Sequence, residues 1–243
     1  PWVIPIDTVR IVGQQGLIES SLYRPSKATR IARIAAQMND EEQKTTLRLL
    51  DGSIGPTELT EAGLNQAAQI RALDLATESV EFSYFKKQLG QDEYRARYIS
   101  LLTARSKLGA ASPEPDWQEP LRPDRGHGSN RFSLGTGFRA DDYYLQAKIR
   151  PAYHNLLDAD AGYIAGSQID FADLVLRYYP EENRLRLHNL NLIEIVSLSP
   201  RSRFFKPISW KVKTGLIQRP ADDGGDHLVY ELSPGGGLSL IHI

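Results

Sequence analysis

The chain has 243 residues, of which 41% are hydrophobic and 24% are charged, so it can bury a sizeable core. Its net charge of -1 provides no basic field for nucleic-acid phosphates, and we expect no nucleic-acid partner. The absence of cysteine excludes disulfides, thiolate metal sites and cysteine nucleophiles from these residues.

Both ends of the sequence favour a piece of a longer protein. The chain starts at Pro1, its only methionine is Met38, and no signal peptide is visible. Residues 238–243, LSLIHI, resemble translated sequencing adaptor rather than native protein sequence. The sequence has no run of about 18 uncharged apolar residues, so it predicts no transmembrane helix.

Residues 1–110 are predicted to form a helical module after a short extended entry. Asp7 would cap a first short helix after the strand-like residues before it, and residues 17–25 look extended again. Ser26 would cap a second helix, whose apolar face carries Ile31, Ile34, Ala35 and Met38. Asp40 with Gln43 has the spacing of a capping box, and Asp51 and Gly52 would end that third helix.

Two more helices are expected before residue 110. A long one should run from about Thr60 to Leu89 and end at Gly90. The last should be capped near Asp92 and end at Gly109, with a buried stripe of Tyr94, Tyr98, Leu101, Leu102, Arg105 and Leu108. We interpret these apolar faces as core surfaces. Residues 111–130, rich in proline and glycine, are predicted to be a linker between two domains.

From residue 131 the hydrophobic period is two, which predicts an antiparallel β-domain over residues 131–243. Phe132, Leu134, Thr136 and Phe138 alternate with polar or small residues, and four further segments up to residue 232 repeat the pattern. Residues 180–183, PEEN, are predicted to be a hairpin connection, a phase slip between Leu187 and Leu190 predicts a bulge, and residues 221–226 are predicted to be a turn. About seven sequential strands result.

The meander fits two architectures, because a dry face leaves the same pattern whether it points to a core or to lipid. Long strands, aromatic residues at strand ends and polar residues in the other phase favour a membrane barrel. We therefore predict an α+β chain: an N-terminal helical module followed by part of an outer-membrane-like β-barrel, incomplete at the C-terminus. A soluble barrel or sandwich is the alternative.

Several segments carry a family resemblance. These are WVIPIDTVR at the start, LYRPSKATR, LLTARSKLG, GHGSNRFSLGTG, the IRPAYHNLLD region and the stretch from LRYYPEENRLRLHN to WKVKTG. Together they resemble, up to about residue 220, the C-terminal region of Gram-negative relatives of the Lnb-type lipoprotein N-acyltransferases. The resemblance implies a cysteine-dependent periplasmic domain that ends near the start of this chain, followed by helices and a barrel-like region.

The resemblance also implies a location and partners. We expect the periplasmic side of the outer membrane, with outer-membrane lipid and the protein's own N-terminal catalytic domain as partners. No catalytic residue can be carried over to this chain, and we predict that these residues are not themselves an enzyme.

His127, within GHGSN, is the most conspicuous candidate for chemistry. A general base needs an oriented partner, and Ser129 is near, but no G-x-S-x-G elbow encloses it. We interpret the segment as a loop that leads into the sheet. His154 could gather with Asp158 and Asp160 at one end of the sheet, but an Asp-rich loop is usually only a loop, and the five histidines have no metal-ligand spacing. We predict no metal and no cofactor.

Residues 199–213 are the densest basic and aromatic stretch, which could meet lipid phosphates or acidic polysaccharide or be a solvated turn. The candidate binding residues are His127, Arg131, Arg150, His154, Arg203, Lys206 and Trp210. Three functions remain open: a non-catalytic membrane-associated barrel that positions an acyl-transfer or peptidase-like domain, a soluble periplasmic β-domain that binds glycan or lipid, and a hydrolase that uses His127 or His154.

Overall fold

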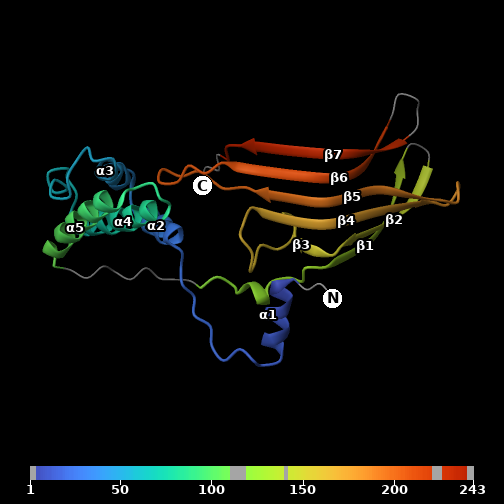
Figure 1. The fold of residues 1–243 in the computed structure, drawn as a ribbon, viewed down its shortest axis with the longest axis horizontal. Helices are drawn as coiled ribbons and strands as arrows, with labels where there is room; N and C mark the ends of the chain where they lie inside the picture. Colours follow the sequence, from blue (N-terminus) through green and yellow to red (C-terminus); the bar gives the residue numbers. More distant parts are fainter. Residues whose placement is uncertain (1–3, 110–118, 140–141, 221–225, 240–243) are drawn as a thin grey trace. The chain divides into compact units, whose positions relative to one another are not determined.

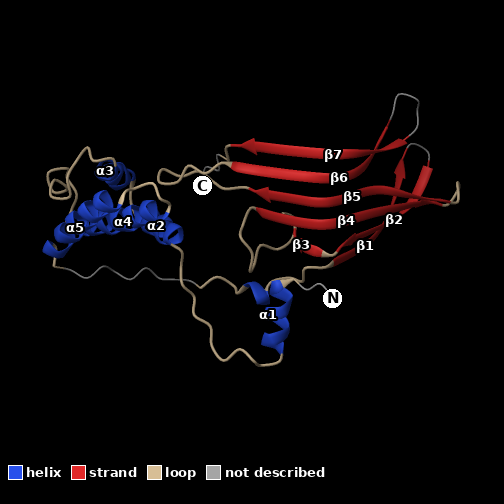
Figure 2. Ribbon diagram, viewed as in Figure 1, coloured by secondary structure: helices blue, strands red, loops and turns tan. Residues whose placement is uncertain are grey.

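The computed structural model describes residues 4–109, 119–139, 142–220 and 226–239. Within these residues, five α-helices precede a seven-stranded antiparallel sheet, so the expected α+β class with N-terminal helices is confirmed (Figures 1 and 2). The chain forms two compact units, residues 22–119 and residues 1–21 with 120–243. This division differs from the expected module of residues 1–110, because the first helix groups with the sheet.

Residues 22–119 form a helical unit whose helix starts follow from side-chain caps. Its helices are α2 (Lys27–Ala36), α3 (Asp40–Leu50), α4 (Gln66–Phe85) and α5 (Gln91–Lys107). Ser26 caps α2 as predicted, by accepting from the N–H of Thr29. Asn39 caps α3 and Asn65 caps α4, each by accepting an N–H three residues on.

Three sequence-based predictions need correction in this unit: one helix cap, the bounds of the long helix and the burial of one residue. The capping box does not start at Asp40, because Asn39 takes the cap position one residue earlier. The long helix starts after Asn65 rather than near Thr60, and it ends at Phe85, before Lys87 adopts a positive φ of 59°. The buried residues of α5 are Leu101 and Ala104, whereas Leu102, predicted to be buried, is exposed.

Helix α4 is the centre of the helical core. It packs against α2, α3 and α5. Its almost fully buried residues are Ala72, Leu73, Leu75, Ala76 and Val80, and the neighbouring helices contribute Ile31, Leu49 and Leu101. These apolar faces are core, as predicted.

The second unit begins with α1 (Pro5–Gln14), which contacts the short 3₁₀ helix η1 (Pro123–Arg125). The sequence placed a strand-like run up to Asp7, but Pro5 opens the helix because its fixed φ suits a first turn. Asp7 therefore lies inside the first turn and is not the cap.

The sheet of this unit is a meander. Its strands are β1 (Arg131–Arg139), β2 (Asp142–Arg150), β3 (Ala152–His154), β4 (Ser167–Tyr179), β5 (Arg184–Ser197), β6 (Ser209–Pro220) and β7 (Asp226–Gly237). The order is β1-β2-β4-β5-β6-β7, with β3 paired to β4. The predicted hairpin between β4 and β5 and the predicted bulge near Leu187 are confirmed, since the register shifts between Val175 and Leu176. Most of the predicted turn at residues 221–226 lies outside the described residues.

One face of the sheet is mainly apolar and the other mainly polar. The apolar face is the more exposed of the two, which is the reverse of a sheet in a soluble protein. One ladder row joins Phe132, Ile149, Leu174, Leu190, Leu216 and Tyr230 across all six long strands, and the rows beside it on that face are also mainly apolar. Leu134 and Phe138 on this face are each 75% exposed. On the other face Arg150, Asp173 and Asn191 are only 3%, 4% and 6% exposed.

Ion pairs and hydrogen bonds cross the strands on the polar face. Lys148 of β2 pairs with Asp173 of β4 at 2.9 Å, Arg177 donates to Gln146 at 3.0 Å, and Lys213 pairs with Glu231 at 3.1 Å. Polar side chains therefore pair across the strands on a shielded surface, while the apolar side chains face outward.

Within the described residues no ladder joins β1 to β7, so the sheet is open rather than a closed barrel. It is nevertheless strongly curled, because Arg139 of β1 forms an ion pair with Asp226 of β7. In the described parts of the chain, no helix combines the length and apolarity needed to cross a membrane.

Candidate functional site: a histidine cluster at one end of the sheet

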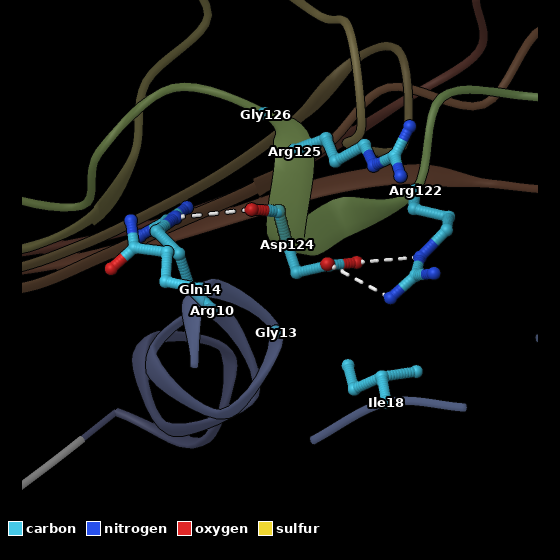
Figure 3. A pocket seen from close by; sticks show the side chains of 8 residues that line it. All are labelled: Arg10, Gly13, Gln14, Ile18, Arg122, Asp124, Arg125 and Gly126. Atoms are coloured by element: carbon cyan, nitrogen blue, oxygen red, sulfur yellow. Dashed lines mark hydrogen bonds and ion pairs between the residues drawn. The ribbon is translucent and has the colours of Figure 1, made fainter. Parts of the chain in front are cut away.

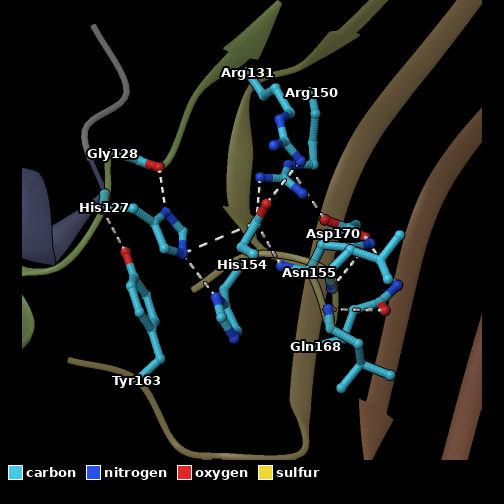
Figure 4. Close-up of polar contacts among 12 residues, drawn as sticks. His127, Gly128, Arg131, Arg150, His154, Asn155, Tyr163, Gln168 and Asp170 are labelled. Carbon is cyan, nitrogen blue, oxygen red and sulfur yellow. Dashed lines mark hydrogen bonds and ion pairs between the residues drawn. The ribbon is translucent and has the colours of Figure 1, made fainter. Parts of the chain in front are cut away.

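A cluster of buried polar side chains lies at the end of the sheet opposite the hairpin connections. His127 precedes β1, Arg150 ends β2, His154 ends β3, and Asp158 lies in the connection from β3 to β4. Figure 4 shows the side chains of His127, Arg150 and His154 converging from separate segments. His154 is 1% exposed, which is unusual for a polar residue at the end of a strand.

The two histidines are joined directly. Nε2 of His127 lies 2.8 Å from Nδ1 of His154, and Nδ1 of His127 lies 2.7 Å from the carbonyl oxygen of Gly128. Because a carbonyl only accepts, Nδ1 of His127 must carry a proton. If both imidazoles are neutral, Nε2 of His127 accepts from the Nδ1–H of His154, and the buried Nε2 of His154 then carries a lone pair.

Tyr163 holds both rings in place. Its ring stacks on His127 and on His154, each at a centroid distance of 4.3 Å. Its hydroxyl donates to the main-chain carbonyl of His127 at 2.8 Å, and Arg10 of α1 donates to the same oxygen at 2.9 Å. The orientation of His127 is therefore fixed through its backbone and its ring.

Asp158 is the acidic partner of the cluster. Its Oδ2 accepts from the N–H of Asn155 at 3.0 Å and from Arg150, and its Oδ1 accepts from Arg131 at 2.8 Å. Burial acts to raise the pKa of Asp158, but the Asn155 N–H and the Arg150 guanidinium outweigh it, so this pKa lies below its usual value. Asp158 is thus a carboxylate at neutral pH.

His154 is biased toward the neutral form. Burial, and after it the neighbouring His127, lower the pKa of His154. Its Nε2 lies 3.8 Å from Oδ1 of Asp160. A half-buried imidazole and a buried imidazole beside a carboxylate are a set of groups that can share a proton or ligate a metal ion.

Asp170 extends the cluster beneath Arg150. It is 1% exposed and accepts from the side chains of Asn155 and Gln168 at 2.7 and 2.8 Å. Its Oδ1 lies 3.6 Å from Nε of Arg150. Both of these atoms are buried without a hydrogen-bond partner among the described residues.

Helix α1 is tied to the same end of the sheet. Ser129, which is 3% exposed, donates to Oδ2 of Asp7 at 2.7 Å, and Arg10 pairs with Oδ1 of Asp7 at 2.5 Å. The hydroxyl of Ser129 is therefore directed to a carboxylate rather than to His127. Ser129 is therefore not placed as the partner of His127 that the hydrolase hypothesis would need.

A polar cavity of about 520 Å³ lies between α1 and η1 (Figure 3). It is lined by Arg10, Gly13, Gln14, Ile18, Arg122, Asp124, Arg125 and Gly126. Arg10 donates to the main chain of Asp124 and Arg122 to its side chain, at 3.2 Å and 2.9–3.0 Å, and these contacts already use much of their hydrogen-bonding capacity.

Four of the seven residues named from the sequence come together here: His127, Arg131, Arg150 and His154. Arg203 and Lys206 lie in the β5–β6 connection, and Trp210 lies at the start of β6. Trp210 borders a groove of about 440 Å³ with Leu198 and Leu238.

Sequence reasoning did not find Tyr163, Asp170 or the site role of Asp7. No local motif includes them, since Tyr163 lies 36 residues from His127. Only the fold brings these side chains to one place.

Comparison with known proteins gives a family. Residues 120–242 match the family described as domain of unknown function DUF7840, which is just over half of the chain. The chain belongs to the DUF7840 family. Residues 21–116 match a second domain of unknown function, DUF7842. The DUF7840 segment holds the histidine cluster and all seven strands, while the DUF7842 segment holds α2 to α5. Neither the curated proteins nor the solved structures gave a match.

Proposed function

We propose that this chain is the non-catalytic, membrane-associated part of a Gram-negative envelope protein, and that its sheet belongs to an outer-membrane-like β-barrel. The barrel contacts lipid with its apolar face and positions an acyl-transfer or peptidase-like domain on the periplasmic side of the outer membrane. The type of that domain is proposed from the resemblance to Lnb-type proteins. Contact with the membrane is proposed from the surface of the sheet.

The inverted burial of the two faces carries the proposal. A soluble sheet buries its apolar face and exposes its polar face, whereas a barrel in lipid turns the apolar phase outward and keeps the polar phase inside. Leu134 at 75% exposure and Asp173 at 4% follow the second pattern. The exposed apolar face extends across every long strand, which is much more than a scattered surface leucine would require.

Strand length supports the same conclusion. Strands β4 to β7 have 12 to 14 residues, and β1 and β2 have nine each. A tilted strand needs about 9–11 residues to cross the hydrocarbon of a bilayer. The hairpin end of the apolar face carries Phe138, Tyr143 and Tyr178, in the position where barrels place an aromatic girdle.

The contacts of α1 support the positioning role. The pairs Asp7–Ser129 and Arg10–His127 fix α1 against the start of the sheet. A domain joined to α1 would be held at this end of the sheet rather than on a free tether. The chemistry of such a domain needs no nucleophile from these residues.

A soluble domain that binds glycan or lipid is the second candidate. The groove beside Trp210 favours it, since an aromatic side chain and Lys211 line an apolar hollow. This candidate must also explain a large outward apolar face, for which a soluble protein would need a second protein layer.

Single-cysteine labelling tests the proposal, because the chain contains no cysteine of its own. The variants Leu134→Cys and Ser133→Cys place an environment-sensitive fluorophore on opposite faces of β1, one residue apart. The full chain is refolded into phosphatidylcholine vesicles, which are then floated on a density gradient and titrated with lipids that carry a quencher in the acyl chain.

The expected result is flotation of both variants, with strong quenching at position 134 and weak quenching at position 133. A chain that stays in the aqueous fraction, or equal quenching at the two positions, would contradict the proposal. The soluble alternative predicts no flotation together with saturable binding of a lipid or glycan that Trp210→Ala removes.

A further inference from the structure

We infer that His127, His154 and Asp158 form a binding site for a divalent transition metal ion of the zinc class. The inference does not depend on the membrane proposal, because the cluster lies at the end of the sheet and uses no residue of the apolar face. It rests on the geometry of three ligand atoms and on three buried polar atoms that lack partners.

The three ligand atoms already lie around one point. One ring nitrogen of His127, one ring nitrogen of His154 and a carboxylate oxygen of Asp158 all lie within 4.8 Å of one another. Two ligands of a tetrahedral zinc ion are about 3.3 Å apart, given bonds of about 2.0–2.1 Å. The observed 2.8 Å between the histidine nitrogens and 3.9 Å from His127 to Asp158 each differ from that by about half an ångström.

Each ligand is oriented by an outer contact of the type found in metal sites. The other nitrogen of His127 bonds to the carbonyl of Gly128, and the other oxygen of Asp158 accepts from Arg131. The ring of Tyr163 stacks on both imidazoles. Two imidazoles and one carboxylate suit zinc and its neighbours rather than magnesium or calcium, which prefer oxygen ligands.

A metal ion also resolves the hydrogen bonding of the cluster. Without one, neutral histidines leave a bare lone pair on the buried Nε2 of His154, 3.8 Å from the carboxylate of Asp160. With an ion between the rings, both facing nitrogens act as ligands and the proton of His154 moves to Nε2. That N–H then faces Asp160, which gives the carboxylate–histidine–metal arrangement.

Arg150 is the group that competes with the ion, because it donates to the same oxygen of Asp158. The carboxylate of Asp170 is a second acceptor for the Arg150 guanidinium. Nε of Arg150 and Oδ1 of Asp170 are both buried without hydrogen-bond partners among the described residues, and they lie 3.6 Å apart. A small shift of Arg150 toward Asp170 therefore frees Oδ2 of Asp158 and pairs both buried atoms.

The local charge balance admits a cation. Asp158 lies beside the guanidinium groups of Arg131 and Arg150, Asp170 lies beside Arg150, and Asp160 lies beside His154. Three acidic groups against two basic groups leave a negative excess when the histidines are neutral. Three protein ligands leave the fourth position of a tetrahedral ion for water or another ligand.

The test uses the full chain in detergent micelles after treatment with a chelator. Zinc is titrated in competition with a fluorescent zinc chelator, and cobalt is added separately because its absorption reports tetrahedral nitrogen and oxygen ligands. We expect one zinc per chain, no comparable binding of magnesium or calcium, and a rise in thermal unfolding temperature with zinc.

The variants His127→Asn and His154→Asn should each weaken zinc binding at least about 100-fold, and Asp160→Asn about 10-fold through its outer contact. His188→Asn and His227→Asn, which change histidines of β5 and β7, are the matched controls and should leave affinity unchanged. Because His154 is fully buried, His127→Asn decides the matter if His154→Asn does not fold, with circular dichroism as the folding check.

Three outcomes would overturn the inference. These are no stoichiometric zinc binding by the wild-type chain, unchanged binding by folded His127→Asn, or an equal loss in the His188→Asn control. In the first case the two histidines are a proton-sharing pair, and the bond between their rings is made by a proton alone.

Discussion

Arg139 in β1 and Asp226 in β7 form a two-point ion pair, although their strands are the two outermost in the sheet. Five steps of about 4.8 Å separate β1 from β7 along the hydrogen-bonding direction, so a flat sheet would hold them about 24 Å apart. Nη2 of Arg139 lies 2.6 Å from Oδ1 of Asp226. The sheet must therefore curl until its edges meet at the hairpin end.

Loss of this ion pair should loosen the curl. We expect Asp226→Asn to lower the free energy of unfolding by about 1 kcal/mol, the scale for a partly exposed pair, since the side chain of Arg139 is 38% exposed. Urea titration in micelles, followed by tyrosine fluorescence, measures the effect. The matched control is Arg219→Gln, whose contact with Glu231 at 3.7 Å is looser and more exposed. An equal loss in the two variants would mean that the edge-to-edge contact has no special role.

A charge on the outward face should be much more costly in lipid than a charge on the polar face one residue away. In vesicles we expect Leu232→Lys to lower the free energy of unfolding by about 2 kcal/mol, because a lysine in the hydrocarbon is poorly solvated. Ser233→Glu lies on the other face of β7, opposite Lys213, and should change this free energy by no more than about 0.5 kcal/mol, because the new carboxylate faces an opposite charge. Similar effects of both substitutions would argue that Leu232 does not contact lipid.

The sheet was accessible to sequence reasoning because alternation and turn residues are local signals. The bulge near Leu187 and the hairpin at residues 180–183 were predicted correctly for this reason. The start of α1 was missed, because Pro5 follows an apolar run that is also typical of a strand. Tertiary contacts of α1 then add it to the sheet unit, which no pattern within residues 1–21 indicates.

The histidine cluster was less accessible. His127 and His154 were each noticed, but they lie 27 residues apart, and no fixed spacing predicts that their rings would touch. Their contact depends on the turn after β2, the pairing of β3 with β4, and the stacking of Tyr163. Such a site arises from topology. The residue types alone therefore suggested candidate residues but did not predict that they contact one another.

Gly215 of β6 is required opposite Asn191, beside a second register shift, in which β5 slips against β6 between Asn191 and Ile193. A Cβ at this position would meet the carbonyl oxygen of Leu190 and lie 2.9 Å from Cα of Asn191, both of which are backbone atoms. We expect Gly215→Ala to destabilise the sheet by about 1–3 kcal/mol, since the backbone must move to relieve the overlap. Gly235→Ala, where the nearest atom is Cγ of Lys211 at 3.8 Å, is the control and should be nearly neutral. Unfolding of both variants in urea compares them directly, and a neutral Gly215→Ala would show that the register shift is not fixed there.

The stability of the helical unit should fall at alkaline pH through Lys27. Its ammonium bonds to Glu81 at 2.5 Å and to Glu78 at 3.1 Å, which joins α2 to α4. Burial acts to lower the pKa of Lys27, but the two carboxylates outweigh it and raise this pKa above the usual value. A raised pKa in the folded state means that the stabilisation is complete below about pH 10.4 and is lost as the pH rises through the folded value.

The comparison with Lys27→Met isolates this effect from other groups that titrate in the same range, among them Tyr94, whose pKa burial and the nearby Glu81 raise. At pH 7 the variant should be less stable by about 1 kcal/mol, as expected for a partly exposed pair. As the pH rises through the raised pKa of Lys27, the difference should close, because the wild-type lysine then becomes neutral as well. Urea unfolding followed by the helical circular dichroism signal measures both limits. A gap that stays constant from pH 7 to pH 12 would show that Lys27 contributes through packing of its aliphatic stem rather than through its charge.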